Sequence, residues 1–132
     1  MKYFWNILFS CMILIEPIGC SGGGGGGDTL PPGMHKVEYE VTTSIPDPKV
    51  SITFIDENGI TQERNDIDAY TNNWIYSFSA KSGTHLQLSS ALHSEEDGTI
   101  HSIINVDYVA VKDTLDYMRG MSAIAEYTIP DD

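Results

Sequence analysis

The sequence is poor in cysteine and in basic residues, and it has no long hydrophobic run. Its 132 residues include two cysteines, Cys11 and Cys20, and 7 Lys and Arg against 19 Asp and Glu. The longest nearly apolar stretch covers residues 3–15, whereas a membrane-spanning helix needs roughly 20 apolar residues. No cysteine follows Cys20. A domain in that part of the chain therefore folds without an internal disulfide and has no thiol nucleophile.

The shortage of basic residues gives a formal net charge of −12 at pH 7. Such a charge repels the phosphate backbone of nucleic acid and works against docking on an anionic lipid surface. We therefore expect no nucleic-acid partner. Acidity by itself names no partner, because it also serves solubility.

Motifs of the common catalytic sites are missing as well. The sequence has no Gly-x-Ser-x-Gly nucleophile motif and no phosphate-binding loop of the Walker type. A zinc site needs three or four converging ligands, and the usual spacings are absent from the four histidines His35, His85, His93 and His101. The acidic stretch "DENGITQE" lacks the later ligands of a calcium loop and is better explained as a hairpin turn. We expect no enzyme activity, no metal and no cofactor.

The N-terminal 19 residues have the pattern of a secretory signal peptide. Lys2 precedes the apolar stretch, and a small residue, Gly19, stands at the expected cut. The tripeptide Ile18-Gly19-Cys20 resembles a bacterial lipobox, in which a diacylglycerol is attached to the cysteine thiol and the chain is cut just before it. We expect Cys20 to carry a lipid anchor of palmitate type. The alternatives are an ordinary signal peptide with an incidental cysteine, or a cysteine that forms an intermolecular disulfide.

Residues 20–33 are predicted to be a flexible tether. After Cys20 and Ser21 come six consecutive glycines, and two prolines precede Gly33. Glycine-rich chains of this length behave as coils with a root-mean-square reach on the order of 20 Å. Such a tether holds a domain clear of the lipid headgroups and lets it reorient.

Residues 34–132 are predicted to form a single β domain. In "HKVEYEVTT" the apolar residues Val37, Tyr39 and Val41 alternate with charged residues, which is typical of a half-buried strand. "KVSITFI", "NWIYSFSA", "THLQLSSAL", "TIHSIINV" and "MSAIAEYTI" follow the same period. Asn58-Gly59 predicts a type I′ hairpin turn, since both central residues of that turn need positive φ. Only residues 112–120 ("KDTLDYMRG") hint at a helix.

Seven or eight short strands with frequent turn signals predict an all-β fold, a single antiparallel β-sandwich of the immunoglobulin-like kind. A small closed barrel is the alternative. Trp74, Tyr76 and Phe78 share one strand face, and we expect them to form core rather than an exposed binding face. Tyr70, Asn72 and Tyr108 fall outside the strand alternation and are the candidate partner-binding residues.

The order of these segments resembles the MmpS-type transport accessory proteins, and it is closer still to the short bacterial lipoproteins that share their β-sandwich domain. The resemblance runs through "HKVEYEVTTS", "VSITFIDENGITQE", "NNWIYSFSAKSGTHLQLSSAL" and "GTIHSIINVDYVAVKD", which is essentially the whole domain. Tyr108 follows Asp107 where the family usually has glycine. The resemblance implies a non-catalytic accessory role beside a membrane transport system.

Two functions follow as expectations. The first is a lipid-anchored accessory module of the bacterial cell envelope that binds another envelope protein, as part of a transport or secretion system. Ser21 is not the aspartate that often retains lipoproteins in an inner membrane, so we expect the outer membrane in a two-membrane cell. The second is a surface module that binds a carbohydrate or another extracellular ligand.

Overall fold

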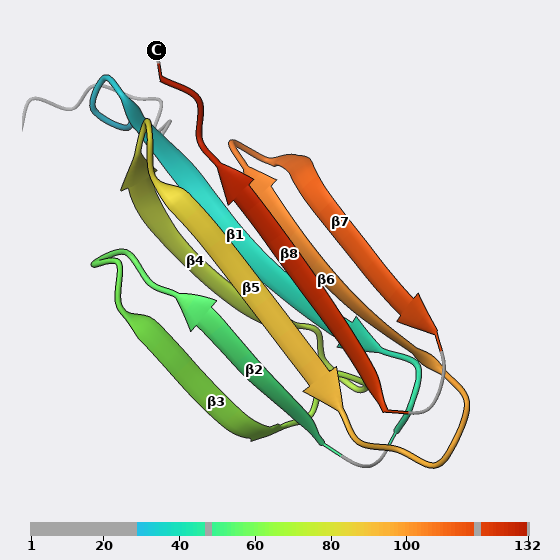
Figure 1. Ribbon diagram of the computed structural model, residues 1–132. Coiled ribbons are helices and arrows are strands. Elements are labelled where there is room, and N and C mark those ends of the chain that lie inside the picture. The colour runs from blue at the N-terminus through green and yellow to red at the C-terminus, as the bar shows by residue number, and fades with distance from the viewer. Residues whose placement is uncertain (1–28, 47–48, 118–119, 132) are drawn as a thin grey trace, which may run out of the picture.

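The computed structural model describes residues 29–46, 49–117 and 120–131. Eight strands make up the fold (Figure 1). They are β1 (Met34–Thr43), β2 (Val50–Ile55), β3 (Thr61–Ile67), β4 (Trp74–Lys81), β5 (His85–Leu92), β6 (Thr99–Val106), β7 (Val109–Tyr117) and β8 (Met121–Thr128). The predicted signal peptide and most of the predicted tether, Cys20 included, lie outside the described residues.

The strands form two antiparallel sheets that pack face to face, with strand orders β4-β1-β6-β7 and β3-β2-β5-β8. The predicted antiparallel β-sandwich is therefore confirmed, with eight strands. Its strand order differs from the immunoglobulin arrangement, in which the first two strands are neighbours in one sheet. Here β1 and β2 belong to opposite sheets, and so do β5 and β6.

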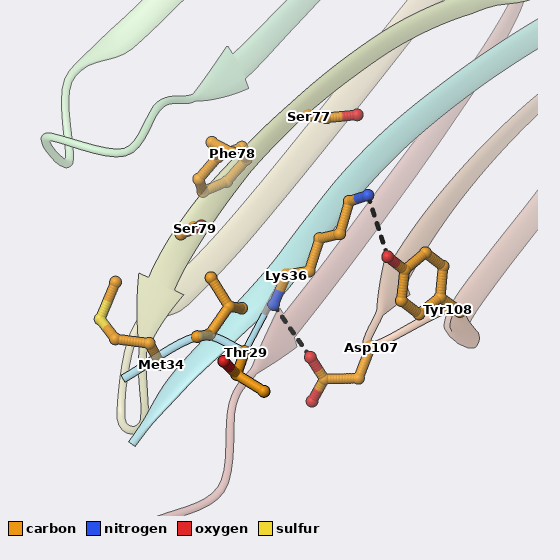
Figure 2. Close-up of a pocket in the computed structure, with 9 residues that line it drawn as sticks. Thr29, Met34, Lys36, Ser77, Phe78, Ser79, Asp107 and Tyr108 are labelled. Atoms are coloured by element: carbon orange, nitrogen blue, oxygen red, sulfur yellow. Dashed lines mark hydrogen bonds between the residues drawn. The ribbon is translucent and has the colours of Figure 1, made fainter. Parts of the chain in front are cut away.

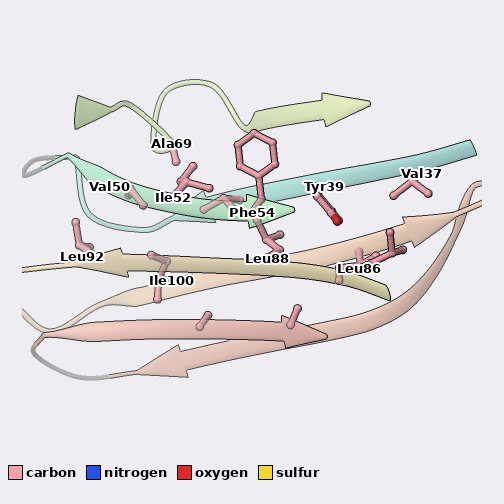
Figure 3. Close-up of a cluster of buried hydrophobic side chains, with 14 of the residues drawn as sticks. Val37, Tyr39, Val50, Ile52, Phe54, Ala69, Leu86, Leu88, Leu92 and Ile100 are labelled. Atoms are coloured by element: carbon pink, nitrogen blue, oxygen red, sulfur yellow. The ribbon is translucent and has the colours of Figure 1, made fainter. Parts of the chain in front are cut away.

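The core lies between the sheets, where the alternating residues meet. Val37, Tyr39 and Val41 of β1 are fully buried, as their period predicts. Phe54 and Leu88 from the other sheet face them (Figure 3). Each fully buried side chain of this size contributes roughly 1.5–3 kcal/mol of hydrophobic stabilisation, so this alternation holds the two sheets together.

The aromatic stripe of β4 packs against the core but is only half-buried. Trp74 and Tyr76 lie with their ring centroids 5.2 and 4.7 Å from that of Phe54, and Phe78 lies 5.2 Å from Tyr39. Because β4 is an edge strand, one side of the stripe faces the rim of the sandwich. The prediction that these rings belong to the core is confirmed for their packing, but they remain partly exposed.

The helix hint at residues 112–120 is wrong, because most of this segment belongs to β7. The side of β7 that faces β8 is polar, which hides the strand alternation. Thr114 Oγ1 donates a hydrogen bond to Ile124 O at 3.1 Å, and Asp116 Oδ2 accepts one from Ser122 N at 2.9 Å. β7 thereby covers backbone groups on the edge of β8 and closes this side of the sandwich.

The predicted type I′ turn at Asn58-Gly59 is also wrong. Gly59 has φ 74°, but Asn58 does not lie in the positive region. Gly59 N donates to Asp56 O at 3.0 Å, and Asp56 N donates to Ile60 O at 3.0 Å. The loop thus needs one left-handed residue at its end, and Gly59 supplies it.

Candidate functional site

The three predicted surface residues lie at opposite ends of the sandwich. Tyr70 and Asn72 are in the β3–β4 loop, which bonds to the last residue of β1, Thr43. Tyr108 is in the β6–β7 turn, two residues after Val106, which pairs with Val37 near the start of β1. Val37 and Thr43 are six positions apart along the strand, which is roughly 20 Å. The structure therefore brings Tyr70 and Asn72 together but does not join Tyr108 to them (Figure 1).

We call the end with the β3–β4 loop the far end, and the end where the chain enters β1 the entry end. At the far end Asp68 orders the loop, because its Oδ1 accepts hydrogen bonds from the amides of Tyr70 and Thr71, both at 3.1 Å. These bonds, that from Thr71 first, lower the pKa of the Asp68 carboxyl. Tyr70 is 51% exposed although its backbone is fixed.

A hollow of about 260 Å³ lies beside Tyr70 at the far end. Its wall includes the apolar side chains Ile45 and Ile67 together with Lys49. An exposed aromatic next to a small hollow with an apolar wall is the kind of feature that anchors a protein partner.

The entry end contains the most unusual backbone of the described chain. Asp107 (φ 50°) and Tyr108 (φ 67°) are the two central residues between the paired Val106 and Val109. Positive φ at both positions defines a type I′ turn. A non-glycine residue in this conformation costs roughly 1–2 kcal/mol, and a short polar side chain such as that of aspartate offsets part of it by local hydrogen bonds.

Asp107 ties three segments together at this end. Its Oδ1 accepts a hydrogen bond from Lys36 N at 2.9 Å, and its Oδ2 lies 2.7 Å from His35 Nδ1. The other ring nitrogen of His35 lies 3.1 Å from Ser82 Oγ in the β4–β5 turn. The bond to His35, and then that from the Lys36 amide, lower the pKa of the Asp107 carboxyl.

Ser82, His35 and Asp107 follow each other in the order of a serine-hydrolase triad. A triad also needs hydrogen-bond donors for the oxyanion that forms on its substrate, and backbone amides beside the nucleophile commonly supply them. The amides of Ser82 and the next residue, Gly83, are already donated, to Gly33 O at 3.0 Å and to Ile129 O at 2.8 Å. We therefore interpret the network as a clamp that fixes the Asp107 turn against β1.

Lys36 and Tyr108 form the wall of a groove beside this clamp. Lys36 Nζ donates a hydrogen bond to Tyr108 Oη at 3.2 Å and lies 4.7 Å from the ring centroid (Figure 2). The groove has a volume of about 760 Å³, and Ser77 and Ser79 of β4 contribute hydroxyls to its lining. Tyr108 itself is 81% exposed.

Sequence reasoning named Tyr108 as a candidate but did not name the residues around it. His35, Ser82 and Asp107 come from β1, the β4–β5 turn and the β6–β7 turn, so no local spacing connects them. The one signal in the sequence is the Asp-Tyr pair between two apolar strands, at a place where a two-residue turn demands positive φ.

Among the residues that the structure describes, no group of three or more His, Cys, Asp and Glu side chains is placed to hold a metal ion. His101 contacts Asp113 on the outer face of the β6–β7 pair. No helix in the described ranges is long and apolar enough to cross a membrane. Comparison with protein-family models and with curated proteins gives no match for this chain.

Proposed function

We propose that this protein is a non-catalytic lipoprotein of the bacterial cell envelope, anchored in the outer membrane through a lipid on Cys20. It acts as an accessory binding module that contacts another envelope protein in a transport or secretion system. The observation that carries the proposal is the placement of the far end. The chain enters the sandwich at one end, and the loop of Tyr70 and Asn72 lies at the other.

This arrangement suits a tethered binding module. An anchor at Cys20, joined to the domain by the predicted tether, keeps the domain near its membrane, which raises its effective concentration for partners there. The far end then points away from the attachment, so its loops are presented to other envelope proteins. The loop is ordered by Asp68 and carries an exposed ring beside a hollow. Contact therefore needs little further ordering, which favours affinity.

Site-specific photo-crosslinking in native envelopes tests the contact. A photoreactive residue in place of Tyr70 or Asn72 is expected to trap one defined protein. The matched control is the same residue in place of Ile124, which is 52% exposed on the outer face of β8. Equal trapping from position 124, or none from the far end, contradicts the proposed contact.

Cell fractionation tests the anchor separately. Cys20→Ser is expected to move the protein from the membrane to the soluble fraction, and mass spectrometry of the unaltered protein should find a lipid on its N-terminal cysteine. Unchanged membrane fractionation of the variant, with no lipid adduct on the parent, would refute the anchor.

A further inference from the structure

Tyr108 has an unfavourable backbone conformation, and its side chain gains little stabilisation from burial. It is held at φ 67°, where glycine is the favoured residue, and it remains 81% exposed. Strained residues persist where the surrounding structure fixes them, and they gather at binding sites. Two contacts fix this one, since Asp107 is clamped by His35 and Lys36 N, and the Lys36 ammonium lies against the Tyr108 ring.

Tyr108 lines two hollows. The groove of about 760 Å³ is lined by Asp107, Ser77 and Ser79 and also by the apolar Leu30, Met34 and Phe78. A second hollow of about 160 Å³ is lined by Glu38 and Asn105. Both hollows are also lined by Lys36 and Tyr108. A ligand that crosses the ring therefore meets side chains that donate hydrogen bonds and side chains that accept them in each direction.

The geometry points to an oligosaccharide of at least two units, neutral or amino-bearing, as the ligand of this groove, with one ring stacked on Tyr108. Sugar hydroxyls both donate and accept hydrogen bonds, which matches carboxylates mixed with amide and hydroxyl groups. The C–H face of a sugar ring is apolar and matches an exposed aromatic ring. A formal charge of −12 disfavours polyanionic ligands.

An extended peptide fits the groove less well. Peptides that add to a sheet bind the backbone of an edge strand. The groove is lined by Lys36 of β1, whose two edges are paired, and by residues 77–79 of the edge strand β4. The unpaired edge of β4 lies on the side away from β1, whereas the Tyr108 ring lies against Lys36 of β1. A strand added to β4 would therefore not cover the ring, and recognition at the ring depends on side chains, as a saccharide requires.

Calorimetric titration of the full chain in detergent micelles tests this assignment, with tetrasaccharides of β-linked glucose, N-acetylglucosamine and mannose as probes. We expect at least one probe to bind and Tyr108→Ala to weaken that binding by about tenfold or more, a change of 1.4 kcal/mol or more. Tyr108→Phe keeps the ring and should stay within about threefold of the parent.

The matched control is Tyr117→Ala, which removes another exposed tyrosine from the opposite end of β7, 60% exposed. It should leave binding unchanged, and so should Cys20→Ser, because the groove does not depend on the anchor. The assignment is overturned if no probe binds at about 10 mM, if Tyr108→Ala binds as the parent does, or if Tyr117→Ala loses as much. A Tyr108-dependent gain for an unstructured peptide over every saccharide would overturn it too. None of these results bears on crosslinking from the far end.

Discussion

Ser90 and Ser102 face each other across the two sheets, with their hydroxyl oxygens 2.6 Å apart and both side chains fully buried. Ser102 Oγ also donates to Ala123 O at 3.2 Å. A hydroxyl has one proton, so Ser90 must be the donor in the bond between the two serines. The hydrogen bonds therefore run from Ser90 to Ser102 to Ala123.

This direction makes the two serines unequal. Ser102→Ala leaves the Ser90 hydroxyl and the Ala123 carbonyl each without this partner, and should lower the free energy of unfolding by about 1–3 kcal/mol. Ser90→Ala removes only the first donor and should cost about 1 kcal/mol or less. Urea denaturation of both variants measures the difference. Equal losses, or a larger loss for Ser90→Ala, would show that the chain runs otherwise.

The aromatic stripe predicts a second ordering of stabilities. Phe54 is fully buried at the centre of the cluster, so Phe54→Ala should cost roughly 3–5 kcal/mol. Trp74 is only half-buried at the rim, and it stacks on Tyr76 with a centroid distance of 6.3 Å. Trp74→Ala should therefore cost less than Phe54→Ala, at or below the lower end of this range, about 3 kcal/mol. Thermal unfolding of the two variants side by side checks this, and a larger loss for Trp74 contradicts it.

The Asp56 carboxylate predicts how stability changes in acid. Its Oδ1 accepts hydrogen bonds from the amides of Asn58 and Ile60, both at 2.9 Å, and its Oδ2 accepts one from Gln62 Nε2 at 2.8 Å. These bonds, that from Ile60 first, lower the pKa of the carboxyl below its ordinary value of 3.8. A lowered folded-state pKa adds stability above the unfolded value, and this stability is lost as the pH falls through the folded value.

The expected result is a fall in melting temperature below about pH 4 that includes a contribution from Asp56. Asp56→Asn keeps the shape but removes the charge, so it should melt lower than the parent at pH 6. The gap between the two proteins should narrow as the pH drops towards 2. A gap that stays constant from pH 6 to pH 2 would assign the difference to packing alone.

Alternation in the sequence was enough to predict the inward faces of β1, β2, β5 and β6, because each of these strands buries one face against the opposite sheet. It failed for β7, whose inward residues Thr114 and Asp116 bond to the edge of β8 instead of filling the core. The alternation of apolar residues shows which face of a strand is buried. It carries no information about polar side chains that cover the edge of a neighbouring strand.

The prediction of the type I′ turn from its residue pair failed for a related reason. Asn58-Gly59 is the stronger type I′ signal, yet that turn forms at Asp107-Tyr108. The choice depends on register, because β6 and β7 pair up to Val106 and Val109 and leave only two residues to connect them. The clamp around Asp107 joins segments that are distant in sequence, so only the folded structure brings it together.

The backbone of Tyr108 gives the last prediction, which separates strain from contact. Tyr108→Ala and Tyr108→Gly both remove the ring and its contact with Lys36. They differ in backbone freedom, because alanine keeps a Cβ at φ 67° and glycine does not. Tyr108→Gly should therefore be more stable than Tyr108→Ala by about 1 kcal/mol. Chemical denaturation of the two variants at one pH measures this difference. If they are equally stable, the turn has relaxed out of the type I′ conformation in the alanine variant. If both are also as stable as the parent, the Tyr108 position carries no strain, and the argument that Tyr108 is held there for binding fails.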